Sequence, residues 1–163
     1  MITARAGTPL RELERELARA GQHLPFEPPR FHGGGTLGGA VACGLSGPGR
    51  PWRGSVRDAV LGVELINGRG EHLRFGGQVM KNVAGYDLGR LQVGAFGTLG
   101  VILAVSLKVL PRPSLERTRE FATDGGAALR LCRRWAREPH PVSATSYHQG
   151  VLRVRLSGAE AAV

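Results

Sequence analysis

The sequence predicts an α+β protein in two parts, and three observations predict it. An apolar run at 59–66, the turn sequence NGRG at 67–70 and a strand-like segment at 71–75 form the pattern of an antiparallel hairpin. A second run rich in Val, Ile and Leu, at 101–109, stops at a Pro-Arg-Pro sequence. Beyond it the pattern changes to strand, helix, strand and strand. We therefore predict an antiparallel sheet with flanking helices over residues 1–113 and an incomplete ferredoxin-like β-α-β-β unit over 114–163.

The first predicted element is a helix over residues 8–21. Thr8 is expected to cap it, Pro9 suits its first position and Gly21 stops it. Its apolar side is expected to comprise Leu10, Leu13, Leu17 and Ala20.

Short helices and an extended connector are predicted between this helix and the strands. Prolines make 25–29 extended, and the Gly-rich stretch 33–49 follows. Thr36 is expected to cap a buried helix over 37–43, and Asp87 is expected to cap a helix that ends near Leu91. In the second part we expect, in order, a strand at 117–122, a helix at 125–137, a strand at 142–148, a turn at 149–150, a strand at 151–156 and the start of another helix at 158–163.

Length and composition exclude several classes of protein. The 163 residues are 42% apolar, which suits one globular domain, or one domain and a fragment. No apolar run approaches the roughly 18 residues of a transmembrane segment, and the charged first residues do not match a signal peptide. Cys43 and Cys132 have no metal-ligand spacing, so we expect a reducing, cytoplasmic compartment and no metal site.

The chain carries a formal net charge of +9, almost all of it from arginine. One explanation is an Arg-rich composition with scattered charges. The other is a surface for an anionic partner or cofactor. The densest clusters, at 50–57 and 130–137, lack the interleaved aromatic residues of a single-strand binder, so nucleic-acid binding is not favoured.

Gly33, Gly35 and Gly38 fit the pattern G-x-G-x-x-G, and Asp58 follows at a suitable distance. We reject a Rossmann site because two prolines, and no strand, precede the first glycine, while Asp58 opens an apolar run instead of closing one. Two alternatives remain. Exposed N–H groups at the start of the 37–43 helix attract an anion such as a pyrophosphate, or the glycines allow tight packing.

The tetrapeptide GTLG occurs at 35–38 and again at 97–100. The flanking sequences do not align, so an internal repeat is not expected. The second copy enters a strand, where glycines permit a tight bend or close approach of a flat ring to the backbone. No catalytic arrangement stands out, because the histidines are dispersed along the chain at His23, His32, His72, His140 and His148.

Four segments, taken in order, carry a family resemblance: GTPLRELERELARAGQHLPFEPP, TLGGAVACG, RGSVRDAVLGVELINGRGEHLRFGG and VMKNVAGYDLGRLQVGAFGTLGVILAVSLKVLPRP. Together they resemble the FAD-linked oxidases of the vanillyl-alcohol-oxidase type, whose FAD-binding domain is of the PCMH type. Within that family the chain is most similar to the FAD-binding subunits of bacterial glycolate oxidases. The resemblance covers roughly residues 1–113 and implies that they form most of the second subdomain, beginning with a strand at MITARAG.

The resemblance also implies a cofactor, FAD, and a set of residues that contact it. One segment lies along the flavin and pyrophosphate and comprises Thr36, Leu37, Gly38, Gly39, Cys43, Gly44, Leu45, Ser46 and Gly47. A second lies close by and comprises Arg53, Gly54, Ser55 and Asp58. A third meets the adenine and ribose and comprises Gly97, Thr98, Leu99, Gly100, Val101 and Ile102. Phe96 stands where many members have Glu.

The family's first subdomain, with its own Gly-rich loop, has no counterpart in this sequence, and the C-terminal part is expected to be shortened. We therefore expect the chain alone to hold FAD weakly or not at all. Apolar surface left open by the missing parts favours a homodimer. The family implies flavin-mediated oxidation of glycolate or a similar 2-hydroxy acid, with electrons passing to partner subunits, one catalytic and one iron–sulfur. It also implies a cytoplasmic location, held at the inner membrane only through such partners. The alternative is a non-catalytic scaffolding subunit.

Overall fold

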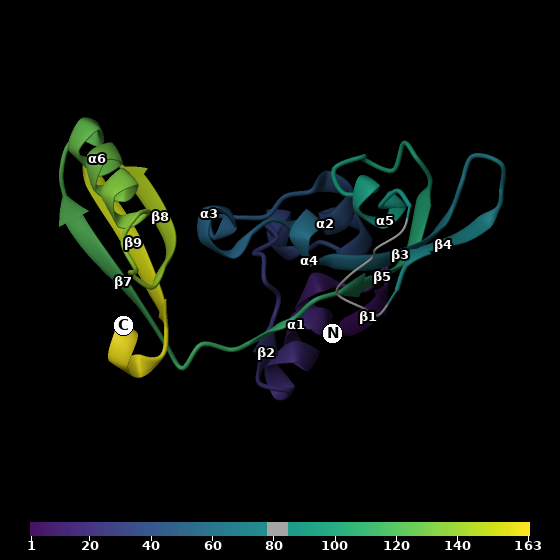
Figure 1. Cartoon of the computed structure of the whole chain (residues 1–163), viewed down its shortest axis with the longest axis horizontal. Helices are drawn as coiled ribbons and strands as arrows, with labels where there is room; N and C mark the ends of the chain where they lie inside the picture. Colours follow the sequence, from purple (N-terminus) through teal and green to yellow (C-terminus); the bar gives the residue numbers. More distant parts are fainter. Residues whose placement is uncertain (78–84) are drawn as a thin grey trace. The chain divides into compact units, whose positions relative to one another are not determined.

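The computed structural model describes residues 1–77 and 85–163, which form two compact units (Figure 1). Unit 1 consists of Met1–Gly47 and Gly54–Arg112, and unit 2 consists of Pro48–Arg53 and Pro113–Val163. The short segment 48–53 therefore belongs with the C-terminal residues. The predicted boundary after residue 113 assigned this segment to the first part. The division into two functional domains stays a prediction.

Unit 1 is built on a four-stranded antiparallel sheet with the strand order β1-β5-β3-β4. Its strands are β1 (Ile2–Arg5), β3 (Val60–Ile66), β4 (His72–Gly76) and β5 (Val101–Leu107). A two-stranded sheet pairs β2 (Gln22–His23) with β6 (Leu110–Pro111). The predicted hairpin is confirmed. Asn67 closes its turn, because its side-chain oxygen accepts hydrogen bonds from the amides of Arg69 (2.9 Å) and Glu71 (3.1 Å).

The helices of unit 1 are α1 (Leu10–Arg19), the 3₁₀ turn η1 (Phe31–Gly33), α2 (Leu37–Cys43), α4 (Val56–Ala59) and α5 (Leu88–Leu91). Two of the predicted caps are confirmed. The Thr36 hydroxyl accepts from the Gly39 amide at 3.2 Å, and the Asp87 carboxylate accepts from the Arg90 amide at 2.9 Å.

Two details of the first helix were predicted wrongly. Extended Pro9, not Thr8, occupies the N-cap position of α1, and no side chain caps the helix there. The Thr8 amide donates to the Arg5 carbonyl instead, in the turn that leads out of β1. Ala20 is exposed, because the helix has ended at Arg19 and the chain turns away at Gly21, where φ is +66°.

The core of unit 1 lies on one face of its sheet. Leucines of α1 and residues of α2 and α4 pack there against β3 and β5, and the buried set comprises Leu13, Leu17, Leu24, Phe26, Leu37, Val41, Val56, Ala59, Val60, Val63, Leu65, Val105 and Leu107. The other face carries the alternate residues of the same strands, among them Thr3, Glu64 and Ser106. Unit 1 therefore has one covered face and one open face.

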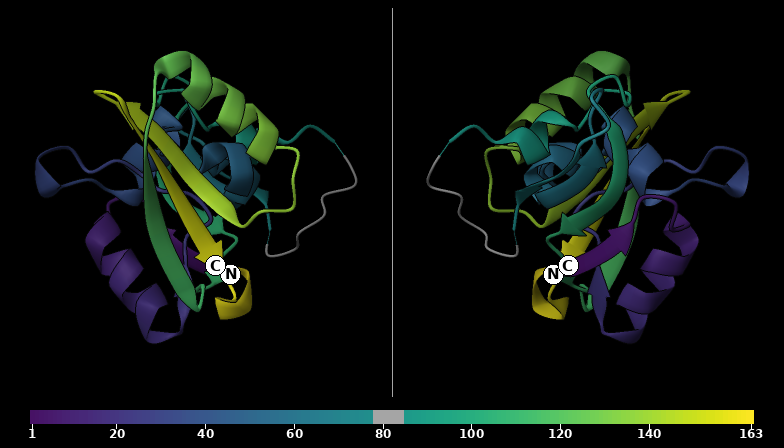
Figure 2. Two further views of the ribbon diagram at one scale, coloured as in Figure 1. Left: turned by 90° about the vertical axis from the view of Figure 1, so that its left-hand side faces the viewer. Right: turned by 90° about the vertical axis from the view of Figure 1, so that its right-hand side faces the viewer.

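Unit 2 is a three-stranded antiparallel sheet of order β7-β9-β8 with α6 on one face (Figure 2). Its elements are α3 (Arg50–Arg53), β7 (Leu115–Ala122), α6 (Gly125–Trp135), β8 (Val142–His148), β9 (Val151–Gly158) and the 3₁₀ turn η2 (Glu160–Ala162). This confirms the predicted β-α-β-β order. A regular helix was expected at 158–163, and the structure has a single 3₁₀ turn there.

The core of unit 2 contains Ala128, Val142, Leu152 and Val154, with the two tryptophans packed against it. Trp52 comes from α3 and Trp135 from the end of α6, whose ring lies 5.6 Å from that of Phe121. Arg53 also ties α3 to this unit, since its guanidinium donates to the Ser157 hydroxyl at 2.9 Å. In the parts of the chain that the structure describes, no helix is long and apolar enough to cross a membrane.

Candidate functional site

The first predicted contact segment borders an open, mostly apolar hollow of about 290 Å³ beside α2. The predicted residues Thr36, Gly39 and Cys43 line it, together with Leu10, Pro28, Pro29, Phe31, Gly34, Gly35, Ala40 and Leu45. Phe31 is 70% exposed and Leu45 is 44% exposed, so two large apolar side chains stand at this hollow largely uncovered by the chain. Such surface is suited to contact with a flat apolar ligand.

The start of α2 does not offer free N–H groups, and this corrects one of the two alternatives drawn from the sequence. The Leu37 amide donates to the Thr8 carbonyl (2.9 Å), the Gly38 amide to the Ala6 carbonyl (2.8 Å) and the Gly39 amide to Thr36. Packing explains Gly38, because a Cβ there would lie 2.6 Å from that of Ala6. The helix start is therefore fastened to the end of β1, and its amides are not available to a pyrophosphate.

Ser46 and Gly47 hold the chain in place behind the hollow. Ser46 is only 5% exposed, and its hydroxyl donates to the Gly44 carbonyl (3.2 Å) and accepts from the Val56 amide (3.0 Å). At Gly47, where φ is +72°, a Cβ would lie 2.2 Å from the Glu27 carbonyl oxygen. The Ser46 hydroxyl is therefore used within the chain, and Gly47 is required by the close approach of Glu27.

The second predicted segment forms a capping box at the start of α4. One Asp58 carboxylate oxygen accepts from the Ser55 amide (2.7 Å) and from the Ser55 hydroxyl (2.8 Å). These hydrogen bonds hold the pKa of Asp58 below its usual range. Gly54 turns with φ at +90° directly against this carboxylate. Both polar side chains are therefore engaged with each other.

The third predicted segment is brought to the far end of α2. The Gly94 amide donates to the Val41 carbonyl (3.1 Å), and the Phe96 amide donates to the Ala42 carbonyl (3.0 Å). These bonds position the turn Gly97–Gly100, after which Val101 and Ile102 begin β5. Phe96 is 72% exposed and Val101 64% exposed. The third segment therefore follows a turn fixed at the C-terminal end of α2, where Gly44 of the first segment lies against Gly94.

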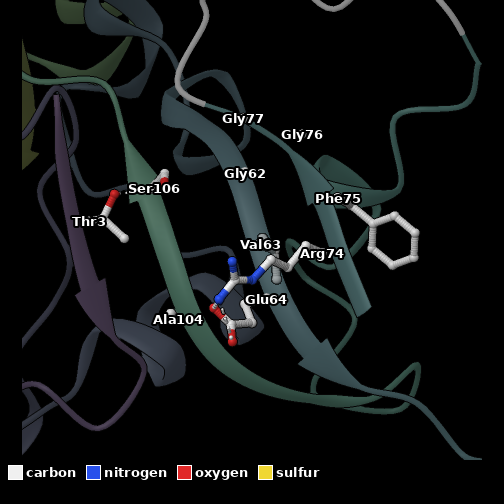
Figure 3. A pocket seen from close by; sticks show the side chains of 10 residues that line it. All are labelled: Thr3, Gly62, Val63, Glu64, Arg74, Phe75, Gly76, Gly77, Ala104 and Ser106. Carbon is white, nitrogen blue, oxygen red and sulfur yellow. Dashed lines mark hydrogen bonds and ion pairs between the residues drawn. The ribbon is translucent and has the colours of Figure 1, made fainter. Parts of the chain in front are cut away.

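A second hollow lies on the open face of the unit 1 sheet and is more polar than the hollow beside α2 (Figure 3). There the Arg74 guanidinium lies over the Glu64 carboxylate at 3.3 Å, and His72 contacts the same carboxylate. Burial raises the pKa of Glu64, but the hydrogen bonds from His72 and Arg74 outweigh it and the net shift is downward. The hydroxyls of Thr3 and Ser106 pair at 2.8 Å across β1 and β5.

The sequence did not indicate that Phe31, Leu45 and α2 line one hollow, nor that His72 and Arg74 contact Glu64. Glu64 was visible as the single charged residue within the apolar run 59–66. Phe31 gave no signal, because its position depends on the kink at His32, where φ is +51°. Among the described residues no three His, Cys, Asp or Glu side chains gather as metal ligands. The described residues at the hollow beside α2 form an apolar surface that could contact a ligand.

The chain is similar in sequence to known proteins. Residues 1–76 match the FAD binding domain family. Over its full length the chain is 54% identical to the glycolate oxidase subunit GlcE of Escherichia coli (strain K12), of which it covers 47%. It is 40% identical to the glycolate oxidase subunit GlcD of Bacillus subtilis (strain 168), over 51% of this chain and 18% of that protein. The predicted resemblance is confirmed.

Related dehydrogenases and a solved structure extend the comparison. The chain is 30% identical to the D-2-hydroxyglutarate dehydrogenase of Xanthomonas citri pv. viticola over 69% of its length, which is 24% of that protein. An alkyldihydroxyacetonephosphate synthase structure matches 94% of this chain with a TM-score of 0.72 at 21% identity, over 34% of its own chain. The fold is of the PCMH type, and FAD is confirmed as the predicted cofactor. The chain spans about half the length of GlcE and less of the other relatives.

The residues at the hollow beside α2 fit an extended, flat cofactor. At Gly34 a Cβ would meet nothing nearer than 4.0 Å, so the chain's own packing does not require glycine there. At Gly97, beside the C-terminal end of α2, a Cβ would also have room, but φ is +74° and the backbone itself favours glycine. Missing side chains at both places leave backbone that a ligand can approach closely. Residues 79–84, which belong to the string that carries the resemblance, lie outside the described residues.

Proposed function

We propose that this chain is the FAD-binding part of a glycolate oxidase subunit and supplies one wall of the cofactor site. The observation that carries the proposal is the 54% identity to GlcE along the whole chain. The names of other relatives favour a 2-hydroxy acid as the substrate, because lactate and 2-hydroxyglutarate, like glycolate, belong to this class. Partner subunits, one catalytic and one iron–sulfur, and a cytoplasmic location belong to the same proposal.

Bound FAD would supply the two-electron oxidation, accepting a hydride equivalent from the carbon that carries the substrate hydroxyl. The residues of this chain would bind and orient it. Thr36, Gly39 and Cys43 would line its path at α2, with Phe31 and Leu45 excluding water from that side. The turn Gly97–Gly100 and the first residues of β5 would hold its other end through backbone groups.

Weak binding by the isolated chain is the second part of the proposal. The hollow is open, and its volume of about 290 Å³ is at the lower limit for pockets that bury even a drug-sized ligand. No free helix amides at residues 37–39 compensate for this by binding the pyrophosphate. A scaffolding role, in which the chain completes a site shared with another chain, would follow if it does not bind FAD at all.

Titration of FAD into the purified chain, followed by flavin fluorescence, tests the binding. We expect a dissociation constant well above the micromolar range, and micromolar or tighter binding would overturn the weak-binding part. In the complex reconstituted with its partner subunits, glycolate should bleach the flavin absorbance. Retention of FAD without bleaching by glycolate or another 2-hydroxy acid would overturn the enzymatic part.

A matched pair of variants locates the site. Ala40→Phe fills the hollow, whereas Ala20→Phe adds the same ring to an exposed position at the end of α1. The first should weaken FAD binding in the complex by about tenfold or more, and the second should leave it unchanged. Equal binding by both variants would show that FAD does not occupy this hollow.

A further inference from the structure

The exposed side of α6 carries a row of arginines that the FAD site does not use. Arg130, Arg133 and Arg134 lie on the helix, and Arg137 follows in the turn that continues it. Their spacing of three or four residues places them on one side of the helix. Together with Glu138 they line a shallow hollow of about 390 Å³. We call Arg130, Arg133, Arg134 and Arg137 the arginine face.

The positive charge of the arginine face is poorly balanced. Arg134 is 3.9 Å from Glu138, but Glu138 also contacts His140 at 2.8 Å, and Arg130 acts on the carboxylate of Asp124. Arg133 and Arg137 have no acidic partner within residues 1–77 and 85–163. Like charges at this helical spacing cost about 0.2–0.5 kcal/mol a pair, although Arg133 and Arg134 in the last turn also interact favourably with the helix dipole.

Elsewhere in unit 2 some arginines are paired, whereas Arg117 and Arg119 on β7 are exposed. Arg153 meets Glu120 at 2.7 Å, and Arg155 and Arg53 both meet Glu116, at 3.6 and 3.8 Å. An Arg-rich composition alone would give scattered charges with and without partners. The arginine face instead gathers four arginines along one side of a helix and its following turn.

The other side of α6 is already occupied. Ala128, Leu131, Cys132 and Trp135 pack on the sheet as part of the core of unit 2. The helix therefore has no apolar side left to enter a lipid bilayer, which is how basic amphipathic helices bind membranes. Leu129, which is 52% exposed, is the one large apolar side chain beside the arginines.

We propose that the arginine face is a docking surface for an acidic protein partner. Guanidinium groups form bidentate hydrogen bonds with carboxylates. An exposed apolar side chain such as Leu129, surrounded by charged residues, is typical of protein interfaces. The face extends only about 10 Å along the helix, which suits a row of Glu or Asp side chains on one partner helix. A nucleic acid would require a longer basic track with stacking aromatic residues.

Binding of fluorescein-labelled poly-L-glutamate, measured by fluorescence anisotropy on the 163-residue chain, tests the proposal. Arg133→Gln/Arg137→Gln removes the two arginines without partners. Arg15→Gln/Arg69→Gln removes the same charge from exposed positions on α1 and on the β3–β4 turn of unit 1. We expect the first variant to lose about tenfold in affinity and the second to lose less than twofold.

Each other outcome overturns the proposal. An equal loss in both variants means that net charge alone drives binding. Tighter binding of duplex DNA or of phosphatidylserine vesicles, lost in the Arg133→Gln/Arg137→Gln variant, would assign the face to a polyphosphate or a membrane instead. Thermal unfolding of both variants is the control. Midpoints at or above that of the parent chain would show that the loss of affinity does not come from unfolding.

Discussion

At the scale of single residues, two non-glycine positions with positive φ show the difference between an ordinary turn and a strained one. Gln149 (φ 48°) is followed by Gly150 in the tight turn between β8 and β9, where this backbone conformation is expected. Phe96 (φ 53°) is a bulky residue held in the same conformation with its ring 72% exposed. The hydrogen bond from its amide to the Ala42 carbonyl keeps the turn in place. The exposed ring makes few contacts that could offset the strain of this backbone conformation.

Replacing Phe96 by glycine should therefore stabilise the isolated chain. Relief of the left-handed backbone outweighs the small loss of ring contacts, and we expect a gain of about 1 kcal/mol in the free energy of unfolding. Urea unfolding of Phe96→Gly against Phe96→Ala, which keeps a Cβ and hence the strain, gives the measurement. A loss of stability in the glycine variant would mean that the ring packs in the folded chain. Gln149→Gly serves as the control for the backbone effect alone.

Asp58 makes stability depend on pH in a defined direction. Hydrogen bonds from the Ser55 amide and hydroxyl hold its pKa below the ordinary Asp value of about 3.9. The folded state thus favours the ionised form, so this contribution is fully present above the unfolded pKa and is lost as pH falls through the folded pKa.

The variant Asp58→Asn isolates this contribution. At pH 7 it should be less stable than the parent chain, and the difference in unfolding free energy should be smaller at about pH 3, below the ordinary Asp pKa. Urea unfolding of both proteins at the two pH values measures it. A difference that stays constant with pH would show that the carboxylate charge is not what stabilises the capping box.

At the scale of elements, α2 is a short helix fixed at both ends. Its first amides are bonded to Thr8, Ala6 and Thr36, and its last carbonyls accept from Gly94 and Phe96. A seven-residue helix is not stable by itself, so these bonds and the burial of Leu37 and Val41 hold it in place. The position of the hollow depends on them.

Thr36→Val removes the capping hydroxyl and keeps the shape of the side chain. We expect a loss of about 1 kcal/mol in stability, together with weaker FAD binding in the complex, because the residue lines the hollow. Thr36→Ser keeps the hydroxyl and should restore stability, as differential scanning calorimetry would show. If Thr36→Ser is as unstable as Thr36→Val, the methyl group and not the cap is what matters.

At the scale of the whole molecule, unit 2 is assembled from two distant stretches of chain. The helix α3 lies within the sequence of unit 1, yet Trp52 packs in the core of unit 2 and Arg53 hydrogen-bonds to Ser157. Two chain segments, before and after 48–53, therefore link the units. The β-α-β-β unit therefore depends on residues that precede it in the sequence by more than its own length.

Trp52→Ala should consequently loosen unit 2 and leave unit 1 intact. Trp52 is partly buried, so we expect a local cost of about 2 kcal/mol, below that of a core tryptophan. Hydrogen exchange measured by mass spectrometry should become faster in β8 and β9 and stay unchanged in β3 and β5. Exchange that accelerates equally in both sheets would contradict this independence. Trp52→Phe is the conservative control.

The sequence alone determined the elements that rest on local rules. The hairpin follows from Asn67-Gly68 between apolar runs, and the caps Thr36 and Asp87 follow from side chains that reach amides three residues away. The order of elements in unit 2 follows from periodicity. The ordered string of motifs also identified the family and its cofactor, which no single glycine pattern did.

Only the tertiary structure decided how the glycines are used. Gly38 and Gly47 are required by the backbones of Ala6 and Glu27, and Gly34 is not required by any neighbour. These contacts join residues that are twenty or more positions apart, so no local pattern reveals them. For the same reason the sequence could not show that the amides at the start of α2 are already bonded, or that residues 48–53 belong to unit 2. Local chemistry specifies the elements, and long-range packing decides which of their groups remain free to bind.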